Sequence, residues 1–178
     1  MDTSAPVRDE PLAIELMNTI WADRTGTHDA LATAELARGW LTAHADRLDS
    51  VTLPQLGPLR QLRDAARTLG SGTPTGRAAA LRLVNSSVRA RWTELRWDGA
   101  LVAAPRAAGT SGSHLISTFA EAIVEAFTSD YEVRACAAPG CVLFYARVRD
   151  RREWCSAACG NRARVARHYD KHRKSAHH

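Results

Sequence analysis

Cysteine is missing from the first 135 residues of this 178-residue chain, and lysine is scarce throughout, with 2 Lys against 22 Arg. A run of about 18 apolar residues is also missing, so we expect no membrane-spanning helix. The first ten residues are charged and the first apolar stretch is interrupted by Glu15, so the N-terminus does not resemble a secretory signal. We therefore expect a cytoplasmic protein, in which disulfides are rare.

Signatures of enzymes are lacking as well. The sequence has no paired carboxylates, no nucleophile elbow and no phosphate-binding loop. His28, His44 and His114 are scattered and match no metal-ligand spacing, so we interpret them as surface or hydrogen-bonded residues. These absences predict a protein that is not an enzyme.

What is present is a group of four cysteines near the C-terminus, spaced Cys136-x4-Cys141-x13-Cys155-x3-Cys159. Two close pairs joined by a short loop are typical of a structural Zn²⁺ site, in which thiolates fill all four tetrahedral positions. An iron–sulfur cluster and unrelated cysteines remain as alternatives. Neither pair has the Cys-x-x-Cys spacing of a redox site, so the sequence predicts one zinc ion.

Positive charge is concentrated around these cysteines. Residues 1–135 have a net charge of −2, whereas residues 136–178 have +7. Four thiolates on Zn²⁺ form a unit of charge −2, so the zinc-bound segment would be nearer +5. A strongly basic zinc module indicates an acidic partner, such as nucleic acid.

Apolar residues at helical spacing predict five helical segments before the cysteines. They are Leu12 to Trp21; a helix capped by Thr33 with Leu36, Trp40 and Leu41 inward; Leu59, Leu62, Ala66 and Leu69, stopped by Gly70; a helix capped by Thr75 with Leu81, Val84, Val88 and Trp92; and, after a loop from Gly109 to Ser113, a helix burying Leu115, Phe119, Ile123, Val124 and Phe127.

Short strands are predicted in two places. Trp92–Trp97 and Ala100–Ala103 flank an Asp-Gly turn, which indicates a β-hairpin. Val142–Val148 is predicted to form a hairpin arm, and Trp154 to Ser156 leads into a helix. The expected fold is mainly α with a small β-hairpin insertion (1–134), followed by a treble-clef-like zinc finger, a β-hairpin plus a basic helix (135–178).

The stretch from Trp154 to Arg162 contains Cys159-Gly-Asn-Arg162 and resembles the CGNR-type zinc fingers. The first cysteine pair with Phe144 fits the same pattern, and Glu15-Leu-Met-Asn18-Thr19 is similar to the helical ABATE domain that precedes such fingers. The resemblance covers 136–169 and, more loosely, 8–130. It implies a bacterial, stress-associated transcription regulator whose finger binds DNA.

Helical geometry divides the last helix into two sides. Cys159, Ala163, Ala166 and Asp170 share one sector, and Arg164, Arg167, Lys171 and Lys174 share a separate one, with Asn161 and His168 at its edge. We expect these last six residues to contact double-stranded DNA, ahead of RNA, although a cationic helix that is merely solvated is the common alternative. Arg162 falls near the cysteines and is expected to hydrogen-bond to thiolate sulfur.

The N-terminal domain is expected to sense a small-molecule effector or to form a homodimer. Asn18 lies on an otherwise apolar helix and could line a ligand pocket, but a buried Asn with local hydrogen bonds is commoner. The resulting hypothesis is a zinc-dependent transcription regulator associated with the nucleoid. The alternative is a protein-interaction adaptor or an RNA-binding module.

Overall fold

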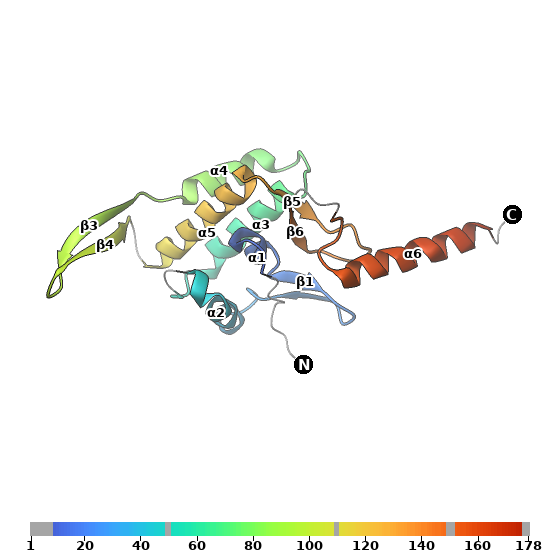
Figure 1. Cartoon of the computed structure of the whole chain (residues 1–178), viewed down its shortest axis with the longest axis horizontal. Helices are drawn as coiled ribbons and strands as arrows, with labels where there is room; N and C mark the ends of the chain where they lie inside the picture. The colour runs from blue at the N-terminus through green and yellow to red at the C-terminus, as the bar shows by residue number, and fades with distance from the viewer. Residues whose placement is uncertain (1–8, 49–50, 109–110, 149–151, 176–178) are drawn as a thin grey trace.

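The computed structural model describes residues 9–48, 51–108, 111–148 and 152–175. A helical body lies between two projections, a β-hairpin at one end and a long helix at the other (Figure 1). In chain order the elements are α1 (Leu12–Met17), β1 (Ile20–Ala22), β2 (Thr27–Asp29), α2 (Ala34–Ala43), a 3-10 turn (Ala45–Arg47), α3 (Leu56–Gly70), α4 (Arg77–Ser87), β3 (Arg91–Trp97), β4 (Leu101–Ala107), α5 (Ser111–Thr128), β5 (Glu132–Ala135), β6 (Phe144–Arg147) and α6 (Ala157–Ser175).

The core of the body forms where α1, α3 and α5 pack against one another. Large side chains from several helices are fully buried there, among them Ile14, Leu62 and Phe119. The strands form three separate antiparallel pairs, β1 with β2, β3 with β4 and β5 with β6. The prediction of a mainly helical fold with a small β-hairpin insertion and a C-terminal hairpin plus helix is confirmed, and the β1–β2 pair is an additional hairpin. None of the described helices is long and apolar enough to cross a membrane.

The helix predicted after Thr33 is confirmed, including its cap. The Thr33 hydroxyl accepts a hydrogen bond of 3.2 Å from the backbone N–H of Leu36, which satisfies one of the free donors at the start of α2. Trp40 and Leu41 point inward as expected.

The helix predicted to run from Leu12 to Trp21 is wrong in its second half. It ends at Met17, and the Thr19 hydroxyl donates to the carbonyl of Leu16 at 2.8 Å, which closes the last turn. Trp21 then lies in β1, opposite His28 of β2, and the two rings stack at 5.1 Å. The four-residue spacing between Met17 and Trp21 is therefore a coincidence, because Trp21 belongs to a strand.

The fourth predicted helix differs at both ends. Gly76, not Thr75, occupies the N-cap of α4, and the helix ends at Ser87. Val88 is already extended, and Trp92 belongs to strand β3.

Two of the predicted inward faces are also partly wrong. Leu81 on α4 and Val124 and Phe127 on α5 are exposed, because Ala80 and Val84 face the core on α4, and Phe119 and Ile123 do so on α5. The fifth helix starts at Ser111, inside the expected loop.

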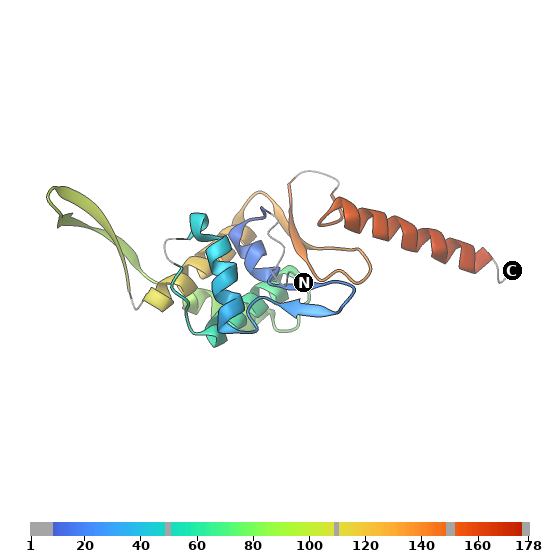
Figure 2. The same cartoon turned by 90° about the horizontal axis from the view of Figure 1, so that it is seen from below.

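The β-hairpin around Asp98-Gly99 is confirmed. Its turn is closed by a hydrogen bond of 2.9 Å from the N–H of Asp98 to the carbonyl of Ala100. The hairpin stands clear of the helical body, at the end opposite α6 (Figures 1 and 2).

The hairpin arm predicted over Val142–Val148 is wrong in its pairing. Strand β6 pairs with β5, which precedes the first cysteine, so that Ala135 lies opposite Phe144. The cysteine turn is thus the loop of this hairpin. A domain boundary between 134 and 135 falls inside β5.

Candidate metal centre and nucleic-acid interface

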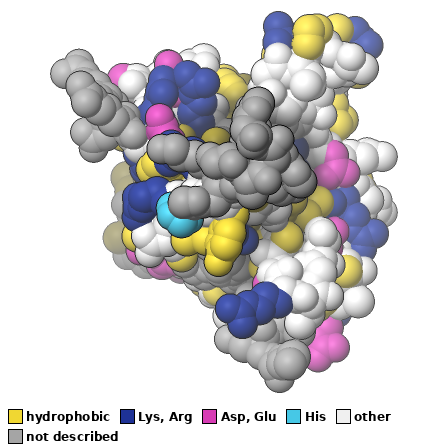
Figure 3. All heavy atoms as spheres, turned by 90° about the vertical axis from the view of Figure 1, so that its right-hand side faces the viewer, with side chains coloured by type: hydrophobic (Ala, Val, Ile, Leu, Met, Phe, Trp, Pro, Cys, Tyr) yellow, Lys and Arg dark blue, Asp and Glu magenta, His cyan; other side chains and the backbone are white. Residues whose placement is uncertain are grey.

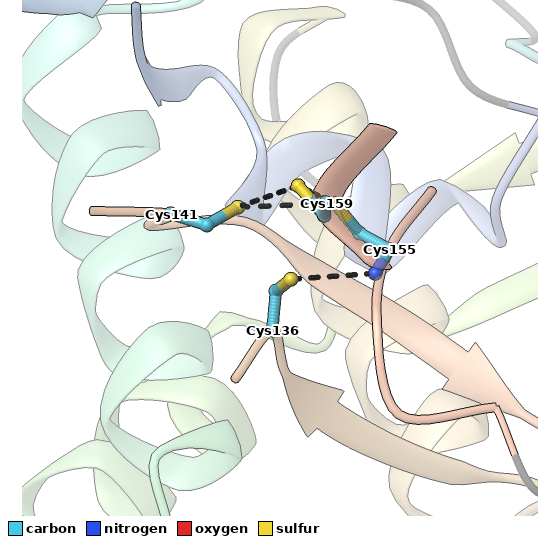
Figure 4. Close-up of side chains that lie close together, drawn as sticks. All are labelled: Cys136, Cys141, Cys155 and Cys159. Atoms are coloured by element: carbon cyan, nitrogen blue, oxygen red, sulfur yellow. Dashed lines mark hydrogen bonds between the residues drawn. The ribbon is translucent and has the colours of Figure 1, made fainter. Parts of the chain in front are cut away.

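The four cysteines come from two places in the chain and converge on one point (Figure 4). Cys136 follows β5, and the turn after it brings back Cys141, whose N–H donates to the carbonyl of Ala138 at 3.0 Å. Cys155 stands just before α6 and Cys159 in its first turn. The fold thus brings the two pairs together, as their spacing predicted.

The distances between the sulfurs fit a zinc ion and not a disulfide. All four Sγ atoms lie within 4.8 Å of one another. Cys141 Sγ is 3.8 Å from both Cys155 Sγ and Cys159 Sγ, and those two are 3.5 Å apart. A tetrahedron with Zn–S bonds of about 2.3 Å has edges of about 3.8 Å, whereas a disulfide needs about 2.05 Å. The cluster therefore suits Zn²⁺, held by four thiolates that leave no open position.

The thiols influence one another's protonation. A hydrogen bond from the Cys155 thiol lowers the pKa of Cys141 to about 5, and the same contact raises the pKa of Cys155. Burial raises the pKa of Cys136. Cys136 and Cys155 therefore ionise less readily than free cysteines, and a bound Zn²⁺ would stabilise their thiolates.

Hydrogen-bond donors surround the sulfurs. The guanidinium of Arg162 donates to Cys159 Sγ at 3.0 Å, and the backbone N–H of Cys155 donates to Cys136 Sγ at 3.4 Å. The contact with Cys159 raises the pKa of Arg162. Such donors orient thiolate ligands and offset part of their negative charge.

The remaining residues of the Cys-Gly-Asn-Arg stretch each make a distinct contact. At Gly160 a Cβ atom would lie 3.1 Å from the Trp154 ring, so glycine lets the indole pack on the start of α6. The Asn161 side-chain oxygen accepts a hydrogen bond from Arg164. Ser156 precedes α6, and its hydroxyl caps the helix by accepting from the N–H of Cys159 at 3.2 Å.

The exposed side of α6 carries the arginines that were predicted to contact DNA. Arg164 and Arg167 are exposed, and the Arg167 guanidinium lies 5.9 Å from the Trp154 ring centre. His168 is exposed and meets Tyr169 edge-on. Lys171 and Lys174 continue the helix, but their side chains lie outside the described residues. Arginine side chains are visible at several places on this end of the molecule (Figure 3).

Asn18 lies at the junction of the helical body and the finger. Its side chain exchanges two hydrogen bonds with the backbone of Phe144 in β6, from Nδ2 to the carbonyl at 3.0 Å and from the Phe144 N–H to Oδ1 at 2.7 Å. The residue is buried. These bonds span the two domains and are not the local ones that the sequence suggested.

The finger hairpin serves two cores at once. Phe144 packs into the core of the body, with Val133 and Ala146 beside it. Leu143 and Tyr145, which point the other way, pack with the cysteines. This alternation follows from the two-residue period of a strand.

Glu10 and Arg152 join the two parts and were missed in the sequence. Buried Glu10 accepts from the N–H of Ala146 and from the guanidinium of Arg152, both at 2.9 Å. Arg152 also donates to the carbonyl of Cys155 at 2.7 Å. No pattern could reveal this pair, because 142 positions separate its members.

Arg67 on α3 makes a second bridge that the sequence did not reveal. It donates to the carbonyls of Met17 at 2.6 Å and Val142 at 3.0 Å, and its guanidinium lies 4.9 Å from the Phe144 ring centre. Arg67 thus connects α3, the end of α1 and the segment that follows Cys141.

Comparison with protein families matches both parts of the chain. The ABATE family, described as "Putative stress-induced transcription regulator", matches residues 10–130, and the CGNR zinc finger matches residues 132–172. No match was found among curated proteins. The two ranges meet just before β5, which assigns the whole β5–β6 hairpin to the finger. The chain belongs to the ABATE family and ends in a CGNR zinc finger.

Proposed function

We propose that this protein is a zinc-dependent transcription regulator that binds double-stranded DNA through α6, with no enzymatic activity. The observation that carries the proposal is the exposed pair Arg164 and Arg167 on α6, in a segment of net charge +7. An α-helix fits the major groove, where arginine reads guanine and contacts phosphate. Its place of action would be the nucleoid in the cytoplasm.

The zinc site supports this role by fixing the start of the helix. Through the shared zinc ion, Cys155 and Cys159 would connect the start of α6 to the turn between Cys136 and Cys141. The packing of Trp154 on Gly160 adds a further contact. A recognition helix must be held rigidly relative to the rest of the protein if it is to present side chains in a fixed register. The zinc would be structural, because four cysteines fill its positions.

The test is duplex binding measured by fluorescence anisotropy over a series of salt concentrations. Replacing Arg164 and Arg167 with Ala should weaken binding and reduce the slope of log affinity against log salt by up to about 1.8, at about 0.9 for each phosphate that is no longer neutralised. The control removes two exposed arginines from the body, Arg38 and Arg82, and should leave the slope unchanged. Equal binding by the Arg164/Arg167 variant and the parent would reject α6 as the DNA-binding helix.

A protein-binding adaptor is the second candidate, because α6 also exposes apolar side chains. Val165 is 54% exposed and Tyr169 is 70% exposed, one turn apart on the same face. Replacing both with Ser should leave duplex binding intact if DNA is the partner. Loss of duplex binding in that variant, with the arginines still present, would instead indicate that Val165 and Tyr169 take part in DNA binding and are not an adaptor surface.

The ABATE domain is proposed to sense an effector and to pass the signal to the finger through the β5–β6 hairpin. A cleft of about 630 Å³ lies between the ends of α3 and α5 and strand β5, with Phe127 and Tyr131 among its lining residues. It adjoins the strand that leads to Cys136. Screening metabolites for a rise in melting temperature, with Phe127→Ala as the comparison, would test whether this cleft is the binding site.

A further inference from the structure

The β3–β4 hairpin is an isolated arm. It projects from the body at the end opposite α6 in both views (Figures 1 and 2). Among the described residues, its two strands pair only with each other. A lone two-stranded hairpin is marginally stable in water, so an arm of this kind gains stability when something covers it.

One face of the arm is apolar and open to solvent. Trp97 lies opposite Leu101 in the register, and Leu95 lies opposite Ala103, so these four side chains share a face. Leu95 is 76% exposed, Trp97 74% and Leu101 69%. The opposite face carries Val102 together with Arg96 and Glu94, so the charged residues of this paired stretch all lie on that face.

We propose that this apolar face packs against the same face of a second copy of the chain, forming an arm-to-arm homodimer. The three large side chains expose roughly 400 Å² of apolar area, which is as much as the largest patch of a typical monomer. Two copies together would bury roughly 800 Å², which is below the roughly 1,000 Å² that specific, stable interfaces exceed. The dimer is therefore weak and reversible.

Charge favours a second copy over other partners. The four side chains of the face are all uncharged, so the face can lie against itself without repulsion. A lipid surface is disfavoured because Asp98 stands at the tip of the arm and would enter the membrane first. Nucleic acid is disfavoured because the outer part of this face, where the three large side chains lie, offers no cation to phosphate, and position 91, an arginine in the same register, stands only at the base of the arm.

The position of the arm suits the rest of the molecule. Because the arm and α6 lie at opposite ends, pairing through the arms leaves both copies of α6 uncovered (Figure 2). The inference does not depend on DNA binding, since it rests on the arm alone.

The test is sedimentation equilibrium of the full-length zinc-loaded protein, from micromolar to hundreds of micromolar concentrations. The parent should dimerise as its concentration rises, and Leu95→Glu should weaken the dimer at least tenfold. The matched control is Arg96→Glu, which places the same side chain at the next position but on the opposite face. It should dimerise like the parent.

A second measurement remains informative even if Leu95→Glu unfolds the arm. The difference in acrylamide quenching between the parent and Trp97→Phe reports on Trp97, and this ring should become protected as the parent dimerises. A parent that stays monomeric at every concentration would overturn the proposal. So would equal dissociation of the two Glu variants, or binding of the parent to anionic vesicles that Leu95→Glu abolishes.

Discussion

The body and the finger achieve stability by different physical means. The body buries large side chains such as Ile14, Leu41 and Phe119 from several helices, whereas the finger core consists of three buried cysteines, two alanines, Leu143 and Tyr145. A core that small cannot stabilise itself by apolar burial. The comparison teaches that the finger depends on two outside sources of stability, the metal and the body to which it is docked.

Removing the metal should have the largest effect, because it should unfold the finger and leave the body folded. Structural zinc contributes about 10 kcal/mol or more to the folding of small fingers. We expect Cys159→Ser, or a strong chelator, to release zinc and to abolish hydrogen-exchange protection in the first turns of α6. Protection in α3 and α5 should persist. Simultaneous loss of protection in all of these helices would show that the body also needs the metal to fold.

Phe144→Ala should have the next largest effect, and the effect should appear in the body although the residue belongs to the finger. The ring is buried in the core of the body, so its removal should cost about 3–5 kcal/mol of unfolding free energy. Urea denaturation followed by the circular dichroism of the helices measures this.

The control for Phe144→Ala is Tyr145→Phe at the next position, on the other face of β6. That change removes a hydrogen bond of 2.9 Å from the Tyr145 hydroxyl to the carbonyl of Arg152 and should cost about 1 kcal/mol. Equal losses in the two variants would contradict the division of the strand between two cores.

Asn18→Ala should come third. It leaves the N–H and carbonyl of Phe144 without their side-chain partner in a buried place, which should cost about 2 kcal/mol. Because these bonds connect the domains, we also expect faster zinc loss to a chelator. The comparison is Thr68→Ala, which removes an exposed hydrogen bond within α3 and should change neither stability nor zinc release appreciably.

The smallest effect concerns pH and belongs to the body alone. Burial of the His44 imidazole opposes its protonation, and so does the positive charge of Arg47. The Glu15 carboxylate, 3.8 Å from Nε2, and the hydrogen bond with the Trp40 carbonyl favour protonation more strongly, so the pKa of His44 is raised above 6.5. A raised pKa adds stability that is complete below pH 6.5 and is lost as pH rises through the folded-state pKa. Unfolding free energies measured between pH 6 and 8 should fall for the parent and fall less for His44→Gln. An equal decline in both would exclude this pair as the cause.

Local patterns predicted the parts of the fold that depend on local interactions. Thr33 caps α2 through its own neighbour three residues on, and Asp98-Gly99 closes its hairpin within the turn. The cysteine spacing predicted the metal site because each pair is formed by residues close in sequence, and the fold has only to bring the two pairs together. In each case the physical cause lies within a few residues of the signal.

The features that the sequence did not reveal depend on distant partners. Helical spacing continued past Met17 to Trp21, although the chain there pairs as a strand with Thr27–Asp29. The apolar run after Cys141 was expected to pair with itself, but its partner is the strand before Cys136. Glu10 and Arg152 meet across 142 positions, and neither carries a local signal of that contact.

Gly70 has a consequence for protein engineering. A Cβ at this position would lie 2.7 Å from the Met17 Cε and 3.0 Å from the Phe144 Cε1, so the glycine makes room for a ring that another domain supplies. A graft of residues 132–175 onto an unrelated carrier would leave Phe144 exposed and prone to aggregation. A truncation before residue 132 would in turn leave a phenylalanine-sized hollow beside Gly70. The CGNR finger of this protein is therefore not a portable module, and a usable graft would need a polar residue at 144.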